Sequence, residues 1–104
     1  MLKRQPIRSK KLREAARGEQ CTLRLPGCDG GGETAVLAHA PFGGKGMGTK
    51  CNDTWSLVSC HNCHSILDGR LQSDISREEI LEACLRGIAE TQDRWLQERL
   101  MEVK

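Results

Sequence analysis

Residues 59–70 read SCHNCHSILDGR, and this run places two cysteines, two histidines and an aspartate close together. Cys60 and Cys63 have the C-x2-C spacing that lets two thiolates from one tight turn share a tetrahedral metal ion. If a helix follows this turn, His64 and Asp68 lie one turn apart on the same helix face. The stretch therefore predicts a metal-binding turn followed by a second pair of metal ligands on a helix.

The rest of the composition restricts the class of protein. A chain of 104 residues fits one domain, small enough that a metal or disulfides often supplement its core. Aromatic residues make up only 3% of the chain, which argues against a binding surface of stacked aromatics. Six cysteines could form disulfides in a secreted protein, but residues 1–6 lead into a basic stretch without an apolar signal core. Without an apolar run long enough to cross a bilayer, we expect a cytoplasmic protein with reduced thiols and no membrane partner.

Positive charge is concentrated at the N-terminus. The formal net charge is +2, but residues 1–18 carry +6 and the remainder carries −4. A basic arm on a mildly acidic domain is typical of contact with nucleic-acid phosphates, although a solvated leader without a specific role would look the same. The candidate contact residues are Lys10, Lys11, Arg13, Arg17, Lys45 and Lys50.

Two cysteine pairs form the candidate structural metal site: Cys21 with Cys28, and Cys60 with Cys63. Four thiolates are a preferred ligand set for structural zinc. Cys51, His61 or His64 could replace one of the four, and some of the thiols could instead be buried apolar residues. The ligand preferences of zinc favour the four-cysteine set. Cys84 lies within an apolar helical stripe and is expected in the core.

Hydrophobic periodicity predicts a small α+β domain. A short helix is expected over 7–18, and a long one over 77–102, where Ser76 begins a capping box. Alternating apolar residues predict three strands, of which the second and third form a hairpin, followed by a short helix that ends before Gly69. The expected strands cover 21–25, 33–40 and 55–59, and the expected short helix covers 63–68.

The chain is thus expected to have three parts within one domain. Residues 1–19 form a basic arm with a short helix, 20–70 form a zinc-bound core, and 71–104 form a C-terminal helix packed on that core. The glycine-rich stretch 42–50 is expected to be a loop. Its order of residues does not match the Walker pattern, so no nucleotide cofactor is expected.

His39 lies near the end of the second predicted strand. A lone histidine on a strand is usually a packed or hydrogen-bonded residue, but the order of elements around His39 gives it another interpretation. A strand histidine, a second strand, a C-x2-C-H knuckle and a ligand-bearing helix together resemble the HNH, or ββα-metal, nucleases. More narrowly, the runs at 15–18, 36–39 and 48–50, with Cys60-x-x-Cys63-His64, resemble the short prophage-encoded nucleases of the YbcO type.

The resemblance implies a DNA endonuclease that depends on a divalent metal ion. His39 would be the general base, His64 and Asp68 would bind catalytic Mg²⁺ or Mn²⁺, and the four cysteines would bind structural zinc. Many HNH enzymes place a metal ligand directly before the base, where this chain has Ala38. Asp53 or Asn52 could supply the missing ligand from the following loop.

Two other interpretations remain open from the sequence. A zinc ribbon that binds nucleic acid or protein without catalysis would make His39 structural and Asp68 a helix-capping residue. A disulfide-bonded scaffold would also account for the cysteines, but such a secreted protein would be expected to have a signal peptide, and none is recognised in the sequence.

Overall fold

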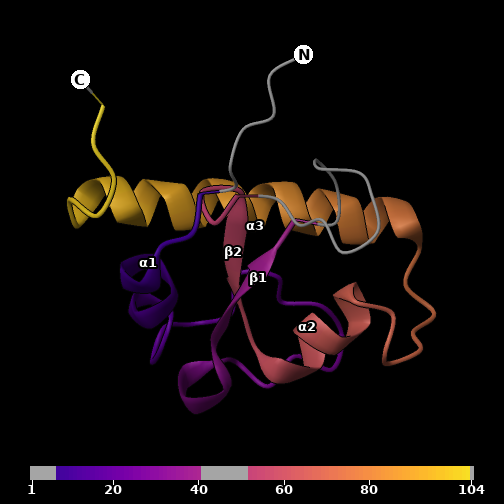
Figure 1. Ribbon diagram of the computed structural model, residues 1–104. Coiled ribbons are helices and arrows are strands. Elements are labelled where there is room, and N and C mark those ends of the chain that lie inside the picture. Colours follow the sequence, from indigo (N-terminus) through magenta and orange to yellow (C-terminus); the bar gives the residue numbers. More distant parts are fainter. Residues whose placement is uncertain (1–6, 41–51, 104) are drawn as a thin grey trace.

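The computed structural model describes residues 7–40 and 52–103. In order, these form α1 (Lys10–Ala15), a 3-10 turn (Gly32–Thr34), β1 (Val36–His39), β2 (Ser56–Ser59), α2 (His61–Leu67) and α3 (Arg77–Gln97). The two strands pair antiparallel, with Val36 opposite Ser59 and His39 opposite Ser56. Figure 1 shows α1 and α2 to either side of this hairpin and α3 running across it. The predicted α+β class and the predicted hairpin are confirmed.

The main core lies between β2 and α3. Leu57 on β2 and Leu23 in the segment between α1 and the 3-10 turn are fully buried. They belong to one cluster with Cys84 and Ile88, which lie on the buried face of α3. Cys84 is therefore a core residue, as its place in the apolar stripe predicted. A smaller cluster around Ala16 and Val58 joins α1 to the sheet.

The helix ends follow local capping. Ser9 caps α1 by accepting from the Leu12 backbone N–H at 3.2 Å, so the helix starts later than the predicted residue 7. The Ser76 hydroxyl accepts from the Glu79 N–H at 3.2 Å, which confirms the predicted start of α3. The long helix ends at Gln97 rather than 102, because Arg99 takes a left-handed φ of 59°.

The predicted strand at 21–25 is wrong. Its alternation is real, since Cys21, Leu23 and Leu25 are all buried. However, Arg24 has φ 51°, outside the extended region, and Thr22 alone donates its backbone N–H to β2, at the Val58 carbonyl. The segment therefore packs against the sheet without joining it.

Close packing holds this segment against α3. A Cβ added at Gly87 would lie 2.7 Å from Thr22 Oγ1, so the helix approaches the loop where it has no side chain.

Within 7–40 and 52–103, no helix combines the length and apolarity that a membrane span requires. The predicted loop at 42–50 lies outside the described residues.

Candidate functional site

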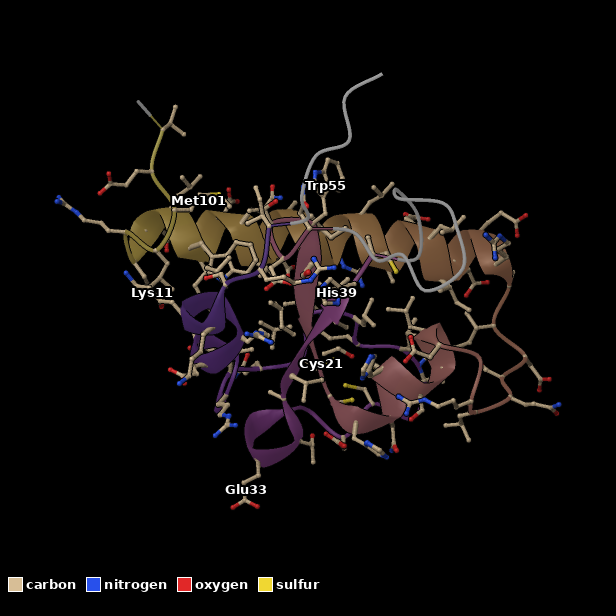
Figure 2. The ribbon with its side chains drawn as sticks, viewed as in Figure 1. Lys11, Cys21, Glu33, His39, Trp55 and Met101 are labelled. Atoms are coloured by element: carbon tan, nitrogen blue, oxygen red, sulfur yellow. The ribbon has the colours of Figure 1, made fainter. Side chains whose placement is uncertain are left out.

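The four predicted cysteines come together at one point. The Sγ atoms of Cys21, Cys28, Cys60 and Cys63 all lie within 4.8 Å of one another. Those of Cys28 and Cys60 are 3.7 Å apart, close to the separation of about 3.8 Å expected for tetrahedral sulfurs at about 2.3 Å from zinc. Figure 2 shows Cys21 pointing toward the sulfur atoms beside the start of α2. The cluster could hold a metal ion, and its ligand type and spacing fit structural zinc.

Backbone N–H groups surround these sulfurs. Cys60 is the N-cap of α2, and its Sγ accepts from the N–H groups of Cys63 at 3.3 Å and Asp29 at 3.4 Å. Cys28 Sγ accepts from the Gly30 N–H at 3.3 Å. Metal-binding side chains typically have such hydrogen-bond partners in addition to the metal. The turn that follows Cys28 is closed by Asp29, which accepts from the Gly31 N–H at 2.9 Å.

Without a cation, this environment disfavours negative charge on two of the sulfurs. Burial raises the pKa of the Cys63 thiol, and the neighbouring thiols raise it further. Burial likewise raises the pKa of Cys28. A bound divalent cation would reverse the balance by stabilising the thiolates. At Cys21, by contrast, burial acts to raise the pKa but hydrogen bonds from backbone groups hold it below its usual value. A cation would therefore be needed to hold Cys28 and Cys63 as thiolates.

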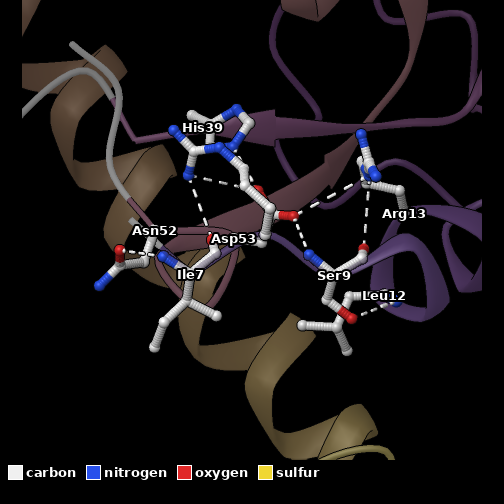
Figure 3. Close-up of polar contacts among 8 residues, drawn as sticks. Ile7, Ser9, Leu12, Arg13, His39, Asn52 and Asp53 are labelled. Carbon is white, nitrogen blue, oxygen red and sulfur yellow. Dashed lines mark hydrogen bonds and ion pairs between the residues drawn. The ribbon is translucent and has the colours of Figure 1, made fainter. Parts of the chain in front are cut away.

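A second polar centre lies at the end of β1. His39 Nε2 is 2.7 Å from Asp53 Oδ1, and the Asp53 side chain is 0% exposed. Asp53 Oδ2 accepts from the Ser9 backbone N–H at 2.6 Å. Figure 3 shows Asp53 between the His39 ring and the segment that leads into α1. Burial by itself would raise the pKa of Asp53, but the hydrogen bonds from Ser9 and His39 and the charge of Arg8 hold this pKa below its usual value.

The N-terminal segment is attached to the chain on both sides of this carboxylate. The Ile7 N–H donates to Asn52 Oδ1 at 2.7 Å, and the Asp53 N–H donates to the Ile7 carbonyl at 2.9 Å. Arg8 and Arg13 bring guanidinium nitrogens to 3.8 and 3.9 Å from Asp53. The structure therefore joins residues that lie more than 40 positions apart in sequence around one buried charge.

The pair predicted on α2 is also formed. His64 Nε2 lies 3.2 Å from Asp68 Oδ2, across one turn of the helix, and Arg70 Nη2 lies 3.2 Å from the same oxygen. Asp68 is the C-cap of α2, and Gly69 follows with φ 77°, as the sequence predicted. Among 7–40 and 52–103, the cysteine cluster is the one group of three or more potential ligands close enough for a single ion. Within these ranges, His64 and Asp68 contact each other without a third potential ligand of this kind beside them.

The predicted basic residues that the structure describes are exposed on α1 or just after it: Lys10, Lys11, Arg13 and Arg17. Figure 2 shows Lys11 directed away from His39, whereas Arg13 reaches Asp53. Lys45 and Lys50 lie outside the described residues, as does Cys51. His61 is exposed on the knuckle, and Asn52 bonds to Ile7.

Sequence reasoning did not find the role of Ser9 or Arg8 in the Asp53 network. The sequence indicates only that Ser9 is an N-cap, because a serine directly before a helix is typical of that position. Its contact with Asp53 is made by the backbone N–H, which any residue except proline could supply. No pattern in the side chains could therefore have predicted it.

Comparison with known proteins identifies the family. The family model described as "Putative nuclease YbcO" matches residues 10–100. "Putative nuclease YbcO" of Escherichia coli K12 and "Putative nuclease ybcO" of Enterobacteria phage 82 are each 43% identical over 89 residues, covering 84% of this chain and 92% of theirs. A solved structure described as a putative bacteriophage protein from Escherichia coli K-12 matches with a TM-score of 0.69 at 36% identity, covering 86% of this chain and 100% of that one. The chain therefore belongs to the YbcO family.

Proposed function

We propose that this protein is a divalent-metal-dependent endonuclease of the HNH type that hydrolyses phosphodiester bonds in DNA. The observation that carries the proposal is the pairing of His39 with buried Asp53 at the end of β1, in a hairpin that leads directly into α2 and its His64–Asp68 pair. The match to the family described as putative nuclease YbcO, and the similarity to its phage relative, support a nuclease in general. The order of two antiparallel strands and a ligand-bearing helix supports the HNH type.

His39 is the proposed general base. Its side chain is 21% exposed, so a water molecule can reach the ring, while one ring nitrogen is held by Asp53. An imidazole can be neutral near pH 7 and accept a proton from that water as it attacks phosphorus. The protein thus presents a fixed but accessible base, which is what hydrolysis of a charged diester requires.

His64 and Asp68 are the proposed ligands of the catalytic ion. Two neighbouring ligands of an octahedral ion at about 2.1 Å lie about 3.0 Å apart, and the observed separation of 3.2 Å fits that requirement. Mg²⁺ typically takes few protein ligands and keeps several waters, which suits a pair rather than a cage. When bound, such an ion would neutralise charge on the phosphoryl and leaving oxygens. Arg70 contacts the same Asp68 oxygen, so it would have to share that oxygen with the ion or move away.

Zinc at the cysteine cluster is proposed as a purely structural ion. All four ligand positions are filled by protein sulfurs, which leaves no open position for substrate, as in other closed structural sites. Zinc there would fix Cys60 and Cys63 at the start of α2. Since His64 follows immediately, the same turn would orient the proposed catalytic ligands.

The basic residues of α1 are proposed to hold the DNA backbone. Lys10, Lys11 and Arg17 are exposed on or beside this helix, and Arg13 connects the helix to the His39–Asp53 pair. Contacts of this kind position the duplex without reading its sequence. They would also make binding weaken as salt concentration rises.

A plasmid-nicking assay with Mg²⁺ or Mn²⁺ tests the proposal. His39→Ala should reduce the nicking rate about 10²- to 10⁴-fold, the usual contribution of a general base. His61→Ala is the matched control, because it removes an exposed imidazole from the knuckle, and it should cleave at the wild-type rate. Equal rates for His39→Ala and wild type would remove His39 as the base. No cleavage of any nucleic acid by the zinc-loaded wild type would refute the nuclease and favour a binding module.

A further inference from the structure

We propose that Asp53 is a positioning residue, which fixes the proton of the neutral His39 ring on Nε2 and so makes Nδ1 the atom that accepts the proton from water. This inference rests on the proposed function, in which His39 is the base. It gives Asp53 a role different from the metal ligand that the sequence suggested. It also makes the N-terminal segment part of the catalytic apparatus.

The hydrogen-bond geometry assigns the proton. The pKa of Asp53 is lowered, so its carboxylate is ionised near pH 7 and can only accept hydrogen bonds. At 2.7 Å from Asp53 Oδ1, His39 Nε2 must therefore be the donor. A neutral imidazole carries one ring proton, so Nδ1 holds a lone pair. Within the described part of the chain, no hydrogen bond to Nδ1 is found, and the His39 side chain is 21% exposed, so water can reach the ring.

The surroundings of Asp53 argue against metal binding. Both oxygens are already hydrogen-bonded, Oδ1 to His39 and Oδ2 to the Ser9 N–H. The side chain is 0% exposed, whereas the Asp68 side chain is 45% exposed. Arg8 and Arg13 place positive charge within 4 Å of the carboxylate, and these cations would repel a divalent ion. Both Asp53 oxygens are thus held by protein donors and buried from solvent, and Asp68 is the more accessible carboxylate.

The Ser9 N–H determines the orientation of a neutral amide side chain that replaces Asp53. This donor is fixed by the backbone at the start of α1 and needs an acceptor at the Oδ2 position. In Asp53→Asn, the amide oxygen should turn to Ser9 and the amide N–H groups to His39 Nε2. Nε2 would then have to accept, and the ring proton would move to Nδ1. The substitution should reverse the tautomer while changing the shape of the site very little.

Nitrogen-15 NMR of the histidine side chains tests the assignment on the zinc-loaded full chain. With three histidines in the sequence, single His→Ala variants assign each ring. We expect the neutral His39 ring to carry its proton on Nε2 in wild type and on Nδ1 in Asp53→Asn. A proton on Nδ1 in wild type would overturn the inference, and that measurement does not need an active enzyme.

Two further measurements separate positioning from metal binding. Asp53→Asn should lower kcat about 100-fold or more, as loss of the correct histidine tautomer does in other hydrolases, with KM for DNA and Mn²⁺ affinity unchanged. Asp68→Asn should weaken Mn²⁺ binding, and Asp93→Asn, an exposed carboxylate on α3, should change nothing. If Asp53→Asn weakened Mn²⁺ binding as Asp68→Asn does, Asp53 would be a ligand and the inference would fail. Absence of cleavage by wild type would instead refute the nuclease, leaving the tautomer and Mn²⁺ results to stand.

Discussion

Replacing Cys60 by serine should unfold this protein, whereas replacing Cys84 by alanine should not. Both thiols are 0% exposed, so burial alone would predict similar effects. Cys60 differs because its sulfur lies 3.7 Å from Cys28 Sγ and accepts two backbone N–H groups. Cys84 lies on α3 in the apolar core, where burial raises the pKa of its thiol to about 11.

The expected magnitudes follow from these surroundings. Structural zinc contributes about 10–16 kcal/mol in zinc-finger peptides at neutral pH, while a small domain has a total stability of about 5–15 kcal/mol. Loss of even half of the zinc contribution in Cys60→Ser would consume most of the stability, lowering Tm by about 20 °C or more. Cys84→Ala removes one buried sulfur, at about 1 kcal/mol or 4–8 °C.

Thermal unfolding and metal analysis of the two variants provide the assay. Wild type and Cys84→Ala should each contain one zinc per chain, and Cys60→Ser should contain less. A chelator should lower Tm in wild type and Cys84→Ala and have little effect on Cys60→Ser. The reasoning would be refuted if Cys60→Ser kept its zinc and lost no more Tm than Cys84→Ala.

Two further predictions concern the packing and charge of the fold. Because the pKa of Asp53 is lower in the folded chain, its carboxylate stabilises the fold above the ordinary pKa of about 3.9, and this stabilisation is lost as pH falls through the lowered folded pKa. Acid titration followed by circular dichroism should therefore show a smaller loss of stability below pH 4 in Asp53→Asn; an identical acid dependence would contradict the assignment. Gly87→Ala should cost about 1–2 kcal/mol, since its Cβ would meet Thr22 Oγ1 at 2.7 Å and overpacking outweighs the gain of about 1 kcal/mol in helix propensity. Urea unfolding should show that Thr22→Ala relieves this cost, and strictly additive effects would show that the two residues do not interact.

The cysteine cluster and the helix pair were predictable because their spacing is local. C-x2-C fixes two sulfurs within one turn, and His64 and Asp68 need only one helical turn between them. Pairing Cys21 and Cys28 with Cys60 and Cys63 needed a chemical argument as well, namely the preference of zinc for four ligands. The structure confirms that these four side chains meet.

The His39–Asp53 centre was not predictable to the same degree. His39 and Asp53 are 14 positions apart, and Ser9 lies 44 positions before Asp53. Nothing local in the sequence indicates which loop carboxylate reaches the ring, and a backbone donor leaves no side-chain signature. The strand at 21–25 failed for a related reason: its alternation reported burial correctly, but left-handed Arg24 prevents a regular ladder.

The cysteine cluster and the His39–Asp53 pair contribute differently to the stability of the fold, and this difference supports different roles for them. Four sulfurs around one point provide a large stabilisation once a metal binds, and they leave no position open for chemistry. A buried carboxylate beside a histidine provides much less, because the cost of removing a charge from water offsets much of the attraction, and apolar residues of similar volume often stabilise as well or better. Yet Asp53 is fully buried, with one oxygen on a backbone N–H and the other on a ring that keeps access to solvent. Stability alone would not require that arrangement. A general base would require it, because the ring must keep one tautomer and also be accessible to water.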